Sequence, residues 1–107
     1  MLFRSYLGNT RRGNIDAKNE RRVMYHADMT YQEMGTKEAG GQIFQTGTWF
    51  YSADGGVCMH HMFPAGSRGL VNCSAGTAIN KKVGDRWTAG GNVGDSEIVK
   101  GYMYFDR

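Results

Sequence analysis

Glycine is unevenly distributed along this chain, and its distribution restricts the secondary structure more than any other feature. Three of the sixteen glycines precede residue 40, and the other thirteen fall between Gly40 and Gly101. Glycine every few residues destabilises helices and supplies the left-handed backbone conformations of tight turns. Between these glycines lie short runs of β-branched and aromatic residues, which are typical of antiparallel strands joined by hairpins. The second half of the chain is therefore predicted to consist of strands and turns.

The strands are placed by alternation of apolar and polar residues between turn signals. A basic loop is expected between the turns at Gly8-Asn9 and Gly13-Asn14. A helix beginning near Asp16 explains residues 22–27 almost as well as a strand does. We expect strands over residues 2–7, 22–27, 42–45, 48–52, 57–63, 69–73, 78–83, 86–88 and 97–105.

One segment, residues 28–39, has the features of a short helix. Thr30-Tyr31-Gln32-Glu33 has the form of a capping box, and Gly40-Gly41 is a natural helix end. Gly35 costs such a helix about 1 kcal/mol relative to alanine. The predicted fold is α+β in a single domain of residues 1–107, with predominantly antiparallel strands in a sheet or partly open barrel.

The net charge of +3 comes largely from the first 22 residues, where six basic residues face two acidic ones. Residues 4–22 could therefore bind nucleic acid or another acidic surface. The alternative is a solvent-exposed terminus with no binding role. The bases are Arg4, Arg11, Arg12, Lys18, Arg21 and Arg22.

The cysteines and the absence of long apolar runs indicate a compartment. No apolar run approaches the length of a membrane-spanning helix, and no apolar segment of the signal-peptide type follows the first residues. We expect a cytoplasmic protein without membrane contact, in which Cys58 and Cys73 are reduced and buried. In a mature secreted fragment, a Cys58–Cys73 disulfide is the alternative.

The middle of the chain is almost uncharged. Residues 40–67 contain one formal charge, that of Asp54, and Trp49-Phe50-Tyr51 places aromatic side chains on both faces of one strand. Either both faces are covered within the domain, or one is a contact surface. We expect self-association, most simply as a homodimer. The predicted binding surface consists of Phe44, Trp49, Tyr51, Met59 and Phe63.

Cys58-Met59-His60-His61 is the sharpest chemical signal. In a strand, Cys58 and His60 share one face, so they could supply two zinc ligands, with His26 and Cys73 as the remaining donors of that kind. The spacing matches no zinc motif. We therefore expect neither a metal nor an organic cofactor.

The same histidines allow a catalytic hypothesis. His60 or His61 could act as a general base in phosphodiester cleavage, with Arg68 or a metal stabilising the developing negative charge. No complete catalytic set accompanies them. The preferred function is thus a non-enzymatic protein that binds a ligand or partner through an aromatic- and Met-rich β surface, and the alternative is a small hydrolase, most plausibly a nuclease.

Overall fold

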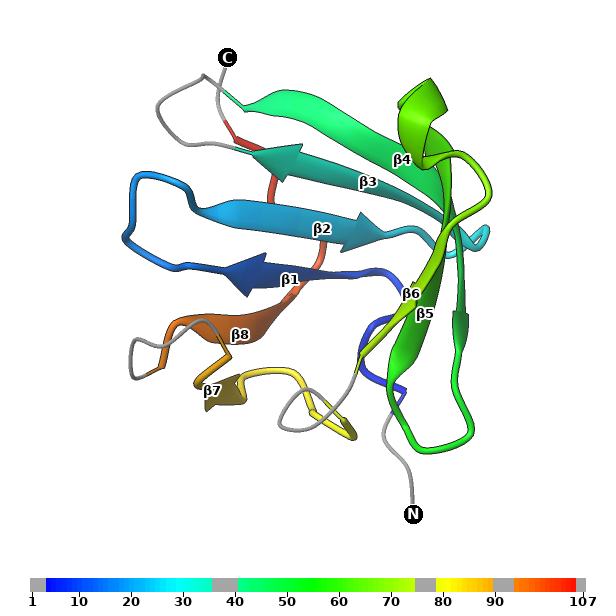
Figure 1. Cartoon of the computed structure of the whole chain (residues 1–107). Coiled ribbons are helices and arrows are strands. Elements are labelled where there is room, and N and C mark those ends of the chain that lie inside the picture. Colours follow the sequence, from blue (N-terminus) through cyan, green and yellow to red (C-terminus); the bar gives the residue numbers. More distant parts are fainter. Residues whose placement is uncertain (1–3, 36–40, 75–78, 90–93, 106–107) are drawn as a thin grey trace.

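The strands form one curled antiparallel sheet, a half-barrel (Figure 1). The computed structural model describes residues 4–35, 41–74, 79–89 and 94–105. The order across the sheet is β6-β5-β4-β3-β2-β1-β8-β7. The strands are β1 (Asn9–Gly13), β2 (Arg21–Tyr25), β3 (Thr30–Gly35), β4 (Gln42–Tyr51), β5 (Val57–Phe63), β6 (Val71–Cys73), β7 (Arg86–Trp87) and β8 (Ser96–Lys100).

The main core lies on the inner face of the half-barrel, because alternate residues of each strand point there. Tyr25 packs edge-to-face on Tyr6 and Trp49, with ring centres 5.0 and 5.3 Å away. Such aromatic pairs add stability beyond the area that they bury. The buried cluster comprises Tyr6, Val23, Tyr25, Tyr31, Trp49, Val57, Trp87 and Ile98.

A smaller core covers part of the outer face. Met24 and Met34 are buried there under Phe105, which belongs to the C-terminal segment that crosses behind the sheet in Figure 1. The Arg22 guanidinium lies 4.0 Å from the centre of the Phe105 ring. The C-terminal segment therefore shields the β2–β3 part of the outer face, whereas apolar side chains of β4 and β5 remain exposed.

The predominantly antiparallel β fold is confirmed, but the predicted helix over 28–39 is wrong in its described part, residues 28–35. Residues 30–35 form β3, which pairs with both β2 and β4. Asp28 belongs to the β2–β3 turn, where its carboxylate accepts hydrogen bonds from the backbone and hydroxyl of Thr30. The apparent capping box, Thr30-Tyr31-Gln32-Glu33, is thus the start of β3, and a hairpin turn precedes it. Among the described residues, the 3₁₀ turn Ala65–Ser67 is the sole helical element, so the α+β class is not confirmed.

Other predicted boundaries also change. The strand over 57–63 matches β5, whereas the two expected at 42–45 and 48–52 form the single strand β4. Of the strand expected over 2–7, residues 2–3 lie outside the described residues and residues 4–7 are not a strand. The expected basic loop contains β1, which pairs with β2 and β8. Residues 79–83 form turns, and residues 101–105 continue past β8 without strand structure. Long-range partners, which local alternation does not reveal, account for these differences.

The radius of gyration is 12.9 Å. A single compact domain of this length is expected to have about 13 Å. No helix in the described part of the chain is long and apolar enough to cross a membrane.

Candidate functional site

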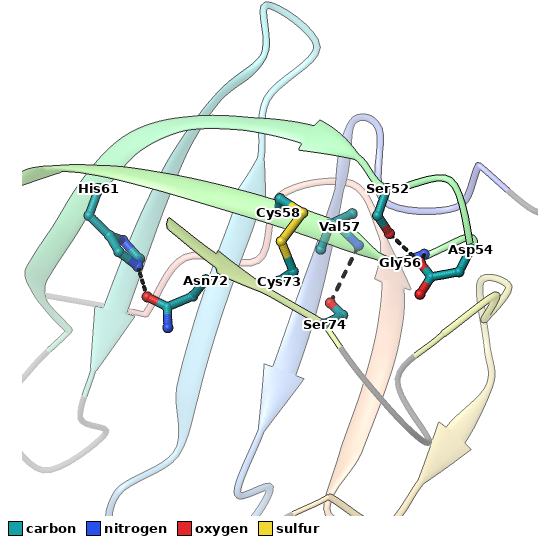
Figure 2. Close-up of a disulfide and its surroundings, with 9 residues drawn as sticks. All are labelled: Ser52, Asp54, Gly56, Val57, Cys58, His61, Asn72, Cys73 and Ser74. Carbon is teal, nitrogen blue, oxygen red and sulfur yellow. Dashed lines mark hydrogen bonds between the residues drawn. A yellow bond between two sulfur atoms is a disulfide. The ribbon is translucent and has the colours of Figure 1, made fainter. Parts of the chain in front are cut away.

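His61, the first catalytic candidate, is buried on the inner face and held at both ring nitrogens. Its Nε2 lies 2.6 Å from the side-chain carbonyl oxygen of Asn72 on β6, so Nε2 carries the proton (Figure 2). Its Nδ1 then accepts a hydrogen bond from the Tyr31 hydroxyl. Burial raises the pKa of Tyr31 to about 12, which keeps that hydroxyl protonated at neutral pH. Because both nitrogens are engaged, His61 links β3, β5 and β6 and has no free base for a substrate.

His60 and Arg68, the other catalytic candidates, do not converge with His61. His60 lies on the outer face, between Thr48 of β4 and Val71 of β6. The exposed Arg68 follows the 3₁₀ turn, and its Nε approaches the Met62 carbonyl oxygen at 3.5 Å. Neighbouring strand residues point to opposite faces, so the two imidazoles cannot act on one bond. This geometry gives the hydrolase hypothesis no support.

Cys58 and Cys73 are joined by a disulfide between β5 and β6 (Figure 2). The prediction of two reduced thiols is therefore wrong, and the alternative of a bridge is correct. Strand register explains the pairing, since Cys58 stands directly opposite Cys73. The backbone nitrogen of Ser74 donates to the Val57 carbonyl at 2.7 Å and extends the same junction.

The candidate zinc ligands Cys58, His60, His26 and Cys73 are not brought together. The disulfide occupies both sulfur atoms. His26 lies at the end of β2, where its ring packs against Tyr102 and its Nε2 is 3.3 Å from Gln32. Within the described ranges, no three His, Cys, Asp or Glu side chains lie close enough to hold a metal ion.

The predicted aromatic surface is divided between the two faces of the sheet. Trp49 is 2 % exposed, and Met59 packs against the main core. The Tyr51 hydroxyl accepts hydrogen bonds from the backbone nitrogens of Tyr6 and Leu7, at 3.2 and 3.0 Å. Phe63 is exposed, and the side chain of Phe44 lies outside the described residues. Three of the five predicted binding residues thus serve the interior.

A different set of apolar side chains is exposed beside them, and we call it the outer apolar patch. Phe50 follows Trp49 and therefore points outward, next to the disulfide, because it pairs with Cys58. Val71 stands opposite His60 on the next strand. The members are 44–53 % exposed and are Phe50, Met62, Phe63 and Val71. Strict alternation along β4 was the sequence signal that could have assigned Phe50 to the exposed face of the sheet and Trp49 to the buried face.

A groove of about 560 Å³ adjoins this patch on the outer face. Met62 belongs to both the patch and the wall of the groove. The remaining wall is polar, and Asp28 carries its one formal charge. Its other side chains come from His26, Thr30, Tyr31, Gln32, Thr46 and Thr48.

The basic residues of 4–22 do not form one stripe. Arg12 and Arg22 bind the carboxylate of Glu20 at 3.0 and 2.8 Å. Arg21 pairs with Glu33, and Arg4 lies over the Tyr51 ring at 4.8 Å. Alternation along β1 and β2 places Arg11 and Arg21 on one face of the sheet and Arg12 and Arg22 on the other.

Comparison of the chain with protein-family models, with curated proteins and with solved structures gives no match.

Proposed function

We propose that the chain is a non-enzymatic interaction protein that forms a homodimer through the outer apolar patch. The observation that supports this most directly is the exposure of Phe50, Phe63 and Val71 on adjoining strands of one sheet. Contiguous exposed apolar side chains commonly mark interaction surfaces. Aromatic residues and methionine are enriched in the buried centres of such surfaces, and charged residues are depleted.

A second copy is the occupant that fits this face. No member of the patch is charged, so shape and apolar contact select what binds, and the exposed Arg68 lies at the edge beside Met62. Projecting phenylalanines and a groove lie beside each other on the same face. In a two-fold interface each copy presents the same surface to the other. The projecting rings of each copy can then enter the groove of its partner.

The disulfide bears on the expected compartment. Structural disulfides persist in oxidising environments and are rare in the cytosol. The Cys58–Cys73 bond therefore favours an oxidising compartment over the cytoplasm predicted from the sequence.

The test is the native mass, measured by light scattering and sedimentation over a range of protein concentrations. We expect wild type to be a dimer. Phe50→Lys and Val71→Lys should each raise the dissociation constant of the dimer by about tenfold or more, because each variant buries a charge in an apolar contact. Val83→Lys is the matched control, since Val83 is equally exposed but lies in a turn outside the patch.

A wild-type monomer at every concentration would overturn the proposal, and so would a dimer that both patch variants leave intact. The hydrolase alternative is tested with RNA and DNA substrates, with and without Zn²⁺ or Mg²⁺. Cleavage that disappears in His60→Ala or His61→Ala would replace the binding function with an enzymatic one.

A further inference from the structure

A polar cavity of about 310 Å³ lies at one end of the half-barrel, away from the outer apolar patch. Strand register brings its charged residues together, since Arg11 of β1 stands opposite Val23, which stands opposite Glu33 of β3. Arg21 pairs with Gly13 at the same end. The polar side chains in its wall are Arg11, Asn14, Asn19, Arg21, Glu33 and Ser96.

Two buried hydrogen-bond donors at this end have no acceptor among the described residues. They are Nε of Arg11 and Nε1 of Trp87. Trp87 is 6 % exposed, pairs with Ser96 in the cavity wall and has the Arg11 guanidinium 5.7 Å from its ring centre. Buried donors in folded proteins are nearly always paired, so an unpaired cluster calls for an external acceptor.

The charges around the cavity also suit an acceptor that is negative. Arg21 is 44 % exposed and holds Glu33 at 3.6 Å, so its guanidinium can turn toward a ligand. Burial raises the pKa of Glu33, and the guanidinium of Arg21 opposes this shift. The nearby Asp95 carboxylate already accepts hydrogen bonds from the Ala89 backbone and the Ser96 hydroxyl, at 2.9 and 3.3 Å.

We infer that this cavity binds the oxyanion group of a small molecule, a phosphate or carboxylate, with Arg11 as the main donor and Arg21 as a supporting donor, while Trp87 lies beside Arg11 and reports on the site. Guanidinium groups present paired N–H donors that match the oxygens of such groups. The inference is independent of dimer formation, because none of these residues belongs to the outer apolar patch.

Inorganic phosphate and acetate are the probes, each compared with chloride at equal ionic strength. Binding is followed by tryptophan fluorescence and by the shift in thermal midpoint. We expect a saturable change with at least one probe, and the more effective probe distinguishes phosphate from carboxylate ligands. A ligand that binds the folded state alone also raises the thermal midpoint.

Arg11→Gln and Arg21→Gln should each weaken binding, Arg11→Gln by about tenfold or more because a charge-assisted hydrogen bond is lost. Arg21→Gln alters an exposed side chain, so it keeps the test valid if Arg11→Gln does not fold. Arg68→Gln, outside the cavity, is the matched control and should bind as wild type does. Trp87→Phe should abolish the fluorescence change and leave Trp49 as the reporter of folding.

The inference is overturned if neither probe gives a saturable change. It is also overturned if Arg21→Gln and a folded Arg11→Gln both bind the probe as tightly as wild type does. Loss of probe binding by Arg68→Gln to the same extent as by the cavity variants would overturn it too.

Discussion

Glu20 is the residue whose charge is most completely enclosed. It is fully buried, and its carboxylate accepts hydrogen bonds from Arg12, Arg22 and the Asp16 backbone. Burial alone would raise the pKa of Glu20, but the hydrogen bonds from Arg12 and Arg22 outweigh it, so the pKa is lowered overall. Arg12 also reaches Glu97 on β8 at 2.7 Å, which ties the β1–β2 loop to the neighbouring strand.

Because the pKa of Glu20 is lowered in the folded protein, the stability of the protein decreases on acidification. The ionised Glu20 carboxylate stabilises the folded protein at pH values above the pKa that Glu20 has in the unfolded chain. This stabilisation is lost as the pH falls through the lower pKa of Glu20 in the folded protein. We expect Glu20→Gln to lose about 3 kcal/mol of unfolding free energy at neutral pH, since the largely enclosed Arg12 and Arg22 both lose a carboxylate partner and Arg12 keeps Glu97. We also expect the variant to lose less stability on acidification. Urea unfolding at a series of pH values measures both.

Glu33→Gln provides the control for this prediction. Burial raises the pKa of Glu33, so its linkage has the opposite sign, and Glu33→Gln should lose at least as much stability on acidification as wild type does. If Glu20→Gln loses as much stability in acid as wild type does, the Glu20 cluster does not govern the acid response.

At the scale of elements, the close approach of β4 and β5 depends on Gly47. The register shifts between Thr46 and Gly47, and a side chain at Gly47 would overlap the His60 carbonyl oxygen. It would also lie 3.0 Å from the Tyr31 ring. This contact allows the sheet to curl so that His61 reaches Tyr31 across β4.

We expect Gly47→Ala to destabilise the protein by about 3 kcal/mol, because the overlap is with backbone that cannot turn aside. Thermal and urea unfolding measure the loss. Gly13→Ala is the matched control, because Gly13 also lies in a strand and an added methyl there meets no atom within 4 Å. Equal stabilities of the two variants would contradict the proposed role of Gly47.

At the scale of the whole molecule, the disulfide holds β6, the strand at one edge of the sheet, against β5. β6 has three residues and pairs with β5 alone, so few hydrogen bonds hold it. Its Asn72 carries the acceptor for His61, and its Val71 belongs to the outer apolar patch. The position of both features therefore depends on the Cys58–Cys73 bond.

We expect the double variant Cys58→Ala/Cys73→Ala to lose about 3 kcal/mol of unfolding free energy, the loop-closure value for a bridge of this span. The bridged cysteines are 15 residues apart. Urea unfolding of wild type with and without a reductant should show the same loss, while the double variant should not respond to reductant. Insensitivity of wild type to reductant would show that β6 is held by other contacts.

Much of the strand content was predictable from local pattern. The glycine-rich turns and the alternation in Val57–Phe63 define β5 correctly, because a half-buried strand needs apolar side chains on one face and a reversal at each end. The uncharged character of residues 40–67 left open whether both faces of this segment are covered or one is exposed, and of the residues predicted for the surface Phe63 is exposed whereas Trp49 is buried. These conclusions follow from residue types and their spacing along a few positions.

Other features depend on residues that are distant in sequence. Thr30-Tyr31-Gln32-Glu33 suits a helix cap locally, but pairing with β2 and β4 makes it a strand. The alignment of Cys58 with Cys73, the enclosure of His61 and the meeting of Arg11 with Trp87 all follow from strand register. Register is set by the combined burial and hydrogen bonding of whole strands, which no local window of sequence contains.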